Sequence, residues 1–278
     1  MADEIRFENF DEPTQRIARP NREKLRQYLD GPCAEKFSGG PVENWRDYIK
    51  LFACVNGQTV IGEASPCYLW SPTAPANIAR LAPKAKILMV LRNPVDRAFA
   101  QYAHMLSFAP ASVPFREHMD AALASTSTRI GELYPFLEFG LYSGQVKRYL
   151  DQFPRRQISI HFYEDYLRAP AAMLRQIFEF LEVDSDFVPE RTQRYMEAKI
   201  PRFRAAGRWL KKLGLWQLTR TITPPGLRRM AFRKRESLAL EPADHASLIA
   251  YYRDDIKELT TLLNRDLSHW LTANPSHG

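Results

Sequence analysis

A run of apolar residues, Lys86 to Leu91 (KILMVL), stops at Arg92 and is followed at once by the amphipathic stretch NPVDRAFAQYAHM. The run has no polar alternation, which predicts a strand of a parallel sheet with both faces covered. Asn93 can cap a helix, and Pro94 suits the first helical position because proline has no N–H group, so a helix is predicted from Asn93 to about Ser107. A buried strand that ends in an arginine and leads directly into a helix constrains the fold more than any other feature of the chain.

Predicted strands and helices alternate through the middle of the chain. Gln58–Ala64 and Gln157–Phe162 are predicted strands. Predicted helices cover about 44–52, 71–81 (with Ser71 as its cap and Pro72 at its first position), 114–125, 141–152, 171–182 and 242–264. This order predicts an α/β fold with a parallel sheet flanked by helices on both faces.

The chain has 278 residues, 45% of them hydrophobic, which is enough for one sizeable domain. We expect a single domain over 1–278, made of an irregular part (1–57), an α/β core (58–183), a basic segment (199–235) and a C-terminal helix (242–270). The basic segment contains twelve of the 39 basic residues and none of the 32 acidic ones, so the net charge of +7 is a local property.

Several classes of protein are disfavoured by the residue pattern. The three cysteines are widely spaced without a CxxC pair, which indicates reduced thiols and neither a disulfide framework nor a zinc site. The six histidines lack chelating spacing, so no metal is predicted. The acidic start MADEIRF and the absence of an apolar run of about 20 residues predict a cytoplasmic protein.

The residues at the end of the Lys86–Leu91 strand could form an anion-binding site. In open parallel sheets, ligands bind beyond the carboxyl ends of the strands, where helix N-termini present free N–H groups. An arginine there adds a planar fork that suits phosphate. Arg92 can equally pair with a carboxylate at the strand end, and geometry alone leaves both interpretations open.

Longer stretches carry a family resemblance: GEASPCYLWSP, then LAPKAKILMVLRNPVDRAFAQYAHM, then GLYSGQVKRYLDQFPRRQISIHFYEDYLRAP and finally RDLSHWL. Together they resemble the sulfotransferases that use 3′-phosphoadenylyl sulfate (PAPS), in particular a bacterial branch similar to heparan-sulfate sulfotransferases. The resemblance covers 58–183 and the C-terminal helix. It implies a P-loop-like sulfotransferase fold and transfer of a sulfuryl group from PAPS to a hydroxyl or amine of a carbohydrate or small-molecule acceptor.

RNPVDRAFAQY resembles the 3′-phosphate motif of that family, R-x-P-x-x-R-x-x-S-x-Y. The resemblance implies that Arg92 binds the 3′-phosphate of the nucleotide. The serine of the motif, a second phosphate ligand, falls at Ala100, so one charge-assisted hydrogen bond worth about 1.5–3 kcal/mol is lost unless a neighbour such as Gln101 replaces it.

The phosphosulfate loop of the family, P-K-x-G-T-T, has no counterpart here, so the chain would begin downstream of it and lack the first strand of the sheet. We therefore expect poor solubility, a homodimer formed through an open edge, or replacement of the strand by residues near Ile5 to Phe10. Asp3 to Phe7 (DEIRF) resembles the K-E-x-x-F element, which implies that Glu4 is the general base. The alternative is a disordered acidic N-terminus.

Other polar side chains are further candidates. Glu63, predicted to end a strand, and His104, on the helix after Arg92, are candidates for assisting the acceptor. Glu63 can instead pair with Arg92 or Arg97, and His104 can be an ordinary surface or core histidine. Arg97 is expected to form a structural salt bridge, whereas Glu164 and Asp165 are expected to cap a helix or form ion pairs.

The basic segment 199–235 allows three interpretations. It can be a solvated cationic surface. The family resemblance implies that Arg233, Lys234 and Arg235 close over the 3′-phosphate. The mixture of Trp, Leu, Lys and Arg in RWLKKLGLWQLTRTI also suits a membrane surface or an anionic polymer. No aromatic RNA-binding signature accompanies it, so nucleic-acid binding is not predicted.

Three functional hypotheses follow from these patterns. The first is a PAPS-dependent sulfotransferase. The second is a catalytically incomplete relative that binds a nucleotide. The third is a basic protein that binds a membrane surface or a polyanion.

Overall fold

The computed structural model describes residues 23–31, 42, 45–65, 67–108, 114–124, 136–189, 199–201, 232–234 and 239–272. The chain divides into two compact units: Met1–Ala64 with Ser125–Pro135, and Ser65–Ala124 with Phe136–Gly278. The second unit contains the parallel sheet and Arg92, so it carries the predicted anion site. The limits proposed for a single domain stay a prediction.

The described part of the first unit is helical and irregular. A helix at 23–29 and α2 (Trp45–Lys50) are present, which confirms the helix predicted over 44–52 in a shorter form. The strand predicted at Gln58–Ala64 is wrong, because these residues form no strand and Val60 and Ile61 are 38% and 53% exposed. An extended segment is stable as a strand only when a neighbour takes up its backbone groups and one face is buried.

The sheet of the second unit joins the two strands predicted around the phosphate motif. β1 (Ile87–Leu91) and β2 (Ile158–Phe162) pair in parallel, from Ile87 opposite Ile158 to Leu91 opposite Phe162. Parallel pairing needs a long crossover, and the crossover here contains helices. The predicted α/β fold with a parallel sheet is thus confirmed, and both strands end at the same edge.

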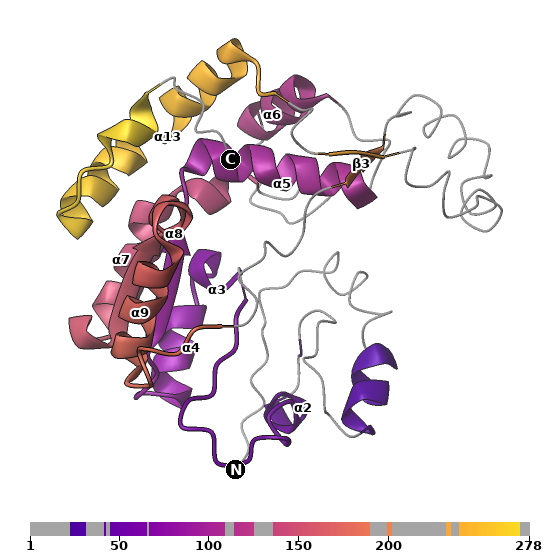
Figure 1. Cartoon of the computed structure of the whole chain (residues 1–278). Coiled ribbons are helices and arrows are strands. Elements are labelled where there is room, and N and C mark those ends of the chain that lie inside the picture. Colours follow the sequence, from indigo (N-terminus) through magenta and orange to yellow (C-terminus); the bar gives the residue numbers. More distant parts are fainter. Residues whose placement is uncertain are drawn as a thin grey trace. The chain divides into compact units, whose positions relative to one another are not determined.

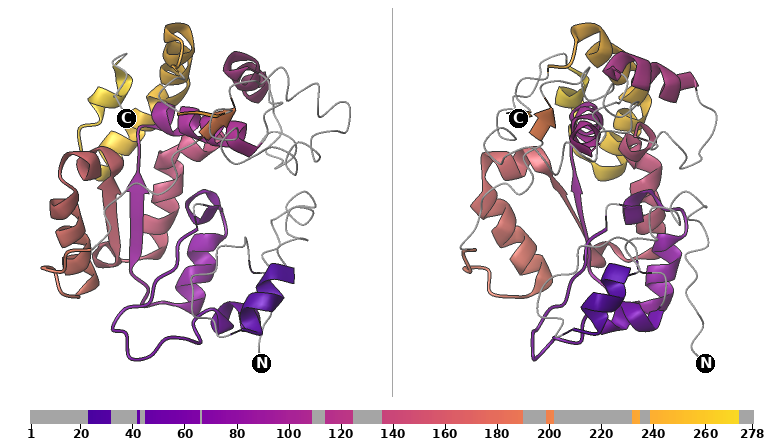
Figure 2. Two further views of the ribbon diagram at one scale, coloured as in Figure 1. Left: turned by 45° about the vertical axis from the view of Figure 1, so that its right-hand side comes forward. Right: turned by 90° about the vertical axis from the view of Figure 1, so that its right-hand side faces the viewer.

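Helices make up most of the rest of the second unit. Figure 2 shows the two strands between α4 and α7 on one side and α8 and α9 on the other. The α-helices are α3 (Cys67–Trp70), α4 (Ala74–Leu81), α5 (Pro94–Phe108), α6 (Phe115–Ala124), α7 (Tyr142–Gln152), α8 (Tyr163–Arg168), α9 (Pro170–Leu181) and α13 (Pro242–Leu263). Short 3₁₀ turns are η1 (Glu138–Gly140), η2 (Arg155–Gln157) and η4 (Ser268–Leu271).

Most predicted helix limits are confirmed, but α4 starts later than expected. The predicted cap was Ser71 with Pro72 at the first position, whereas α4 begins at Ala74 after Thr73. Pro75 occupies its first turn, and the Ser71 hydroxyl accepts the Ala74 N–H at 3.1 Å. The stretch SPTAP offers two hydroxyls and two prolines, so its sequence alone does not fix which pair starts the helix.

The expectation that both faces of β1 are covered is wrong. Met89 and Leu91 are buried, but Leu88 and Val90 on the opposite face are 42% and 50% exposed. Side chains alternate between the faces of a strand, so only one face of β1 packs against the core.

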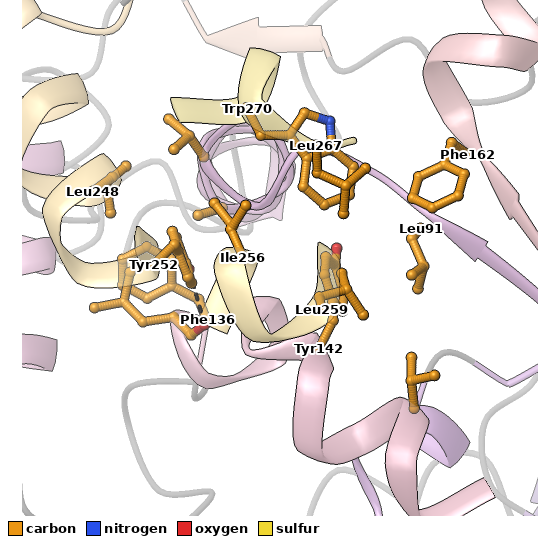
Figure 3. Close-up of a cluster of buried hydrophobic side chains, with 14 of the residues drawn as sticks. Leu91, Phe136, Tyr142, Phe162, Leu248, Tyr252, Ile256, Leu259, Leu267 and Trp270 are labelled. Atoms are coloured by element: carbon orange, nitrogen blue, oxygen red, sulfur yellow. Dashed lines mark hydrogen bonds between the residues drawn. The ribbon is translucent and has the colours of Figure 1, made fainter. Parts of the chain in front are cut away.

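That core is built largely by the last long helix, α13. Figure 3 shows Tyr252, Ile256 and Leu259 of α13 in the buried cluster that also contains Leu91 and Phe162, with Tyr252 at the side of the cluster away from Leu91. The Tyr252 hydroxyl donates to the carbonyl of Leu137 at 2.8 Å, which satisfies its one polar atom in this apolar setting. The predicted C-terminal helix is confirmed, and it packs against α7 and α5.

A small antiparallel ribbon is the described part of the basic segment. β3 (Lys199–Pro201) pairs with β4 (Phe232–Lys234), and β3 lies against α5 (Figure 1). The remainder of 199–235 lies outside the described residues. Across the part of the chain that the structure describes, no helix is long and apolar enough to cross a membrane, and no group of three or more His, Cys, Asp or Glu side chains could hold a metal ion.

Candidate functional site

The candidate site begins at the turn between β1 and α5. β1 ends at Leu91, Arg92 and Asn93 form the turn, and α5 starts at Pro94. The Asn93 side-chain oxygen accepts the Val95 N–H at 3.0 Å, and Asn93 is buried. The predicted capping role of Asn93 and the predicted first position of Pro94 are confirmed, so the first turn of α5 points its positive end at this edge of the sheet.

The Arg92 side chain lies over an aromatic ring. Its guanidinium carbon is 5.0 Å from the centroid of Tyr163, which directly follows β2. The two residues meet because the parallel strands end in register at the same edge. Among the described residues of its own unit, no carboxylate oxygen lies within 4.0 Å of the Arg92 guanidinium, so the charge is not used in an ion pair there.

The neighbouring acid binds the backbone of the turn instead. One carboxylate oxygen of Glu164 accepts the Asn93 N–H at 2.8 Å, while the other is buried and has no hydrogen-bond partner in the described structure. Asp165 pairs with Arg265 at 2.6 Å and with Arg168 at 3.6 Å. The expected ion pairing is confirmed for Asp165, whereas Glu164 forms neither an ion pair nor a cap of its own helix among the described residues.

The prediction that Arg97 forms a salt bridge is wrong for the described residues. Its guanidinium donates to the side-chain oxygen of Gln101 at 2.6 Å and to the carbonyl of Phe136. Arg97 lies one turn into α5, where it faces the backbone before η1. Its N–H groups donate hydrogen bonds to neutral oxygens there and form no ion pair with the described residues. Ala100 is partly buried on the same helix and offers no polar group, and replacement of the missing serine by the Gln101 amide, whose oxygen accepts from Arg97, stays a prediction.

Tyr142, the first residue of α7, supports the turn from below. It is buried, and the backbone N–H of Arg92 lies near its phenol oxygen and acts to lower the pKa of the phenol. Burial raises the pKa of Tyr142 to about 12, although the charges of Arg97 and Arg92 act in the opposite direction. The phenol is therefore neutral at physiological pH and serves as a fixed dipole under the arginine.

Two side chains of α7 hold the segment that follows the GEASPCY motif. Arg148 donates to the carbonyl of Trp70 at 2.9 Å, and the Tyr149 hydroxyl donates to the carbonyl of Tyr68 at 2.9 Å. Cationic and hydroxyl donors suit the unpaired carbonyls at the end of a short helix such as α3. The backbone of 68–70 is thus fixed to α7.

The remaining predicted site residues are not all brought together. His104 is exposed on α5, about 15 Å along the helix axis from Pro94 by its rise per residue. Glu63 is exposed in the first unit. The pKa of Tyr48 is raised to about 12, mainly because Tyr48 is partly buried and secondarily because of the Glu63 charge. Glu4 and Arg235 lie outside the described residues, and Arg233 and Lys234 belong to β4.

Sequence reasoning missed Tyr163 and Tyr142. Tyr163 follows a predicted strand directly, so the rule that ligands gather at the carboxyl ends of parallel strands could have found it. Tyr142 carries no such signal, because its contact with Arg92 joins positions fifty residues apart.

Comparisons with known proteins agree with this arrangement. Residues 63–200 match the family model described as "Sulfotransferase domain". The matched stretch contains β1, the Arg92 turn and β2. These residues belong to the sulfotransferase family. A sulfotransferase from Alicyclobacillus acidocaldarius, known from a crystal structure, superposes with a TM-score of 0.63 at 28% sequence identity, over 88% of this chain and 85% of that one.

Similar proteins also occur among heparan sulfate sulfotransferases. The chain is 29% identical over 218 residues to bifunctional heparan sulfate N-deacetylase/N-sulfotransferase 3 of Mus musculus, covering 75% of this chain and 23% of that protein. It is 32% identical over 124 residues to heparan sulfate glucosamine 3-O-sulfotransferase 3B1 of Mus musculus, covering 43% of this chain and 30% of that protein. The chain thus spans about a quarter to a third of these relatives' length.

Proposed function

We propose that this chain is a PAPS-dependent sulfotransferase that transfers a sulfuryl group to a hydroxyl or amine of a carbohydrate or small-molecule acceptor. The observation that carries the proposal is the Arg92 guanidinium, which stands at the N-terminus of α5 without a carboxylate partner among the described residues of its unit. A planar cation beside a helix N-terminus is suited to a phosphate group. Its place in a sulfotransferase domain favours the 3′-phosphate of PAPS as that group.

In the reaction one bond to sulfur forms, another breaks, and one proton is transferred. The acceptor oxygen or nitrogen attacks the sulfur, the bond from sulfur to the 5′-phosphate oxygen breaks, and adenosine 3′,5′-bisphosphate (PAP) leaves with the electron pair. The acceptor proton passes to a base, for which Glu4, Glu63 and His104 are our candidates. Loose in-line transfers of this type depend on positioning and on cations at the leaving group, so firm anchoring of the nucleotide by Arg92 assists the step directly.

The names of the relatives support a carbohydrate acceptor. One similar protein is an N-sulfotransferase and another a 3-O-sulfotransferase, both of heparan sulfate, so amines and hydroxyls of amino sugars are the acceptors we propose. Arg233, Lys234 and Arg235 are proposed to close over the 3′-phosphate. Membrane-surface contact through 199–235 and a homodimer are subsidiary proposals.

The first test is a calorimetric titration with PAP. The wild-type chain should bind PAP, and Arg92→Ala should weaken binding about 10- to 100-fold, because hydrogen bonds to a charged group contribute about 1.5–3 kcal/mol. Arg253→Ala is the matched control, because Arg253 is an exposed arginine of α13 without a partner among the described residues. Equal affinity of the two variants would remove Arg92 from the site.

The second test follows radiolabelled sulfate from PAPS to N-deacetylated heparan sulfate and to an acceptor that carries hydroxyls only. It is run with this chain and with one extended upstream in its gene. Transfer by either chain supports the proposal. PAP binding without transfer by both chains favours the incomplete nucleotide-binding relative, and failure to bind PAP together with binding to anionic vesicles favours the membrane-surface protein.

A further inference from the structure

Three side chains from two other elements converge on the Arg92 turn. The ring of Tyr163 lies under the guanidinium, the carboxylate of Glu164 accepts the Asn93 N–H, and the phenol oxygen of Tyr142 lies near the Arg92 backbone N–H. Of the three, Glu164 is the one that carries a charge. It is also the one that holds the peptide group between Arg92 and Asn93.

The use made of Glu164 is unusual for an acid next to an arginine. An acid and an arginine at neighbouring strand ends can form an ion pair, which would occupy the guanidinium. Here the carboxylate is directed at the backbone N–H of Asn93 at 2.8 Å, and its second oxygen is buried without a partner among the described residues. The acid therefore fixes the turn and leaves the cation free for a ligand.

A negative charge at this position also has a cost for anion binding. It lies near the N-terminus of α5, where the helix dipole attracts anions, and it takes one backbone donor out of reach of a ligand. An acid in such a place is explained only if the order it gives to Arg92 outweighs the repulsion. Arginine side chains lose considerable rotamer freedom on binding, so a fixed backbone and a ring under the guanidinium reduce that loss in advance.

We propose that Glu164 is a positioning residue, which sets the preference of the site for a nucleotide with a 3′-phosphate by holding the Arg92–Asn93 turn in its binding geometry. This inference rests on the proposed function, in which Arg92 receives that phosphate. The two effects of Glu164, positioning and repulsion, can be separated by substitution. Glu164→Ala removes both, whereas Glu164→Gln keeps an oxygen acceptor for the Asn93 N–H and removes the charge.

The test compares the affinity for PAP with that for adenosine 5′-phosphate, which lacks the 3′-phosphate. Glu164→Ala should weaken PAP binding about fivefold or more, because the Asn93 N–H loses its buried acceptor and the turn relaxes, while the affinity for adenosine 5′-phosphate stays unchanged. Glu164→Gln should bind PAP at least as tightly as the wild type. In an Arg92→Ala background, Glu164→Ala should have no further effect on PAP affinity, since it acts through the arginine.

A purely structural capping role gives a different result. Glu164→Ala would then lower the melting temperature but leave the ratio of the two affinities at its wild-type value, which overturns the inference. If Glu164→Ala does not fold, Glu164→Asp replaces it: its shorter side chain keeps the charge but withdraws the acceptor, so unchanged selectivity in that variant also overturns the inference. A wild-type chain that does not distinguish the two nucleotides contradicts the proposed role of Arg92, and the inference falls with it.

Discussion

Replacement of Asp255 should destabilise the fold through the start of a different helix, α7. Asp255 lies on α13, and its carboxylate accepts the N–H groups of Tyr142 at 2.7 Å and Ser143 at 3.0 Å. It also accepts the Ser143 hydroxyl at 2.5 Å. The first turn of α7 has no side-chain cap of its own, so this carboxylate from another helix satisfies donors that would otherwise be buried and unpaired.

The size of the effect follows from the bonds that are lost. Asp255→Ala leaves two backbone N–H groups without an acceptor, whereas the Ser143 hydroxyl can still donate to Glu258 at 3.0 Å. Loss of a cap costs about 0.5–2 kcal/mol, and an unsatisfied buried donor about 1–3 kcal/mol, so we expect the free energy of unfolding to fall by about 2–4 kcal/mol. Asp255→Asn keeps one accepting oxygen and should lose about 1–2 kcal/mol.

The measurement is urea denaturation followed by tryptophan fluorescence, to which the buried Trp270 near Tyr142 contributes. Asp254→Ala is the matched control, because Asp254 is the adjacent acid on α13, is 95% exposed and pairs only loosely with Lys257 at 3.5 Å. It should leave the free energy of unfolding unchanged within error. A loss below about 0.5 kcal/mol for Asp255→Ala, typical of ordinary surface substitutions, would refute the capping argument.

Two further predictions concern the core. A Cβ atom at Gly140 would lie 2.8 Å from the ring of Tyr252, so Gly140→Ala should lower the free energy of unfolding by about 1–3 kcal/mol. Gly144→Ala, at an open position in α7, should raise it by about 0.5–1 kcal/mol. Urea titrations that rank the two variants in the opposite order would contradict this. His118 is buried, with its ring centroid 4.4 Å from that of Phe136, and burial lowers its pKa. The unfolded chain therefore binds the proton more readily than the folded one, and stability is lost as pH falls below about 6.5. The stability of the wild type relative to His118→Phe should therefore fall between about pH 7 and pH 5, and a constant difference across that range would exclude His118 as the cause.

The sequence predicts those parts of the fold whose signals are local. The apolar run before Arg92, the capping side chain of Asn93 and the proline after it lie within a few residues, and the structure confirms the strand, the turn and the helix they predict. The Gln58–Ala64 segment has an equally good strand pattern, but a strand also needs a neighbour, and that requirement is not written in its own residues. The wrong prediction for this segment shows that its residues favour an extended backbone but do not determine whether a neighbouring strand pairs with it.

The candidate site shows the same division. The position of Arg92 at the sheet edge follows from the parallel strand rule, whereas its partners do not. The sequence predicts a salt bridge for Arg97, yet its guanidinium donates to the Gln101 side chain one turn along α5 and to the carbonyl of Phe136, which tertiary packing brings to it. Tyr142 contacts the Arg92 backbone only because α7 returns beneath β1, which no short motif encodes.

The contact between α13 and the start of α7 gives the end of the chain a part in forming the anion site. Asp255 orders the backbone of Tyr142, and the Tyr142 phenol in turn supports Arg92, although 163 positions separate Asp255 from Arg92. A nascent chain that has emerged from the ribosome only as far as α9 already contains the whole RNPVDRAFAQY stretch proposed to bind phosphate, but not α13. Nucleotide binding should therefore arise late in synthesis, and removal of α13 should abolish it without touching a single residue of the motif.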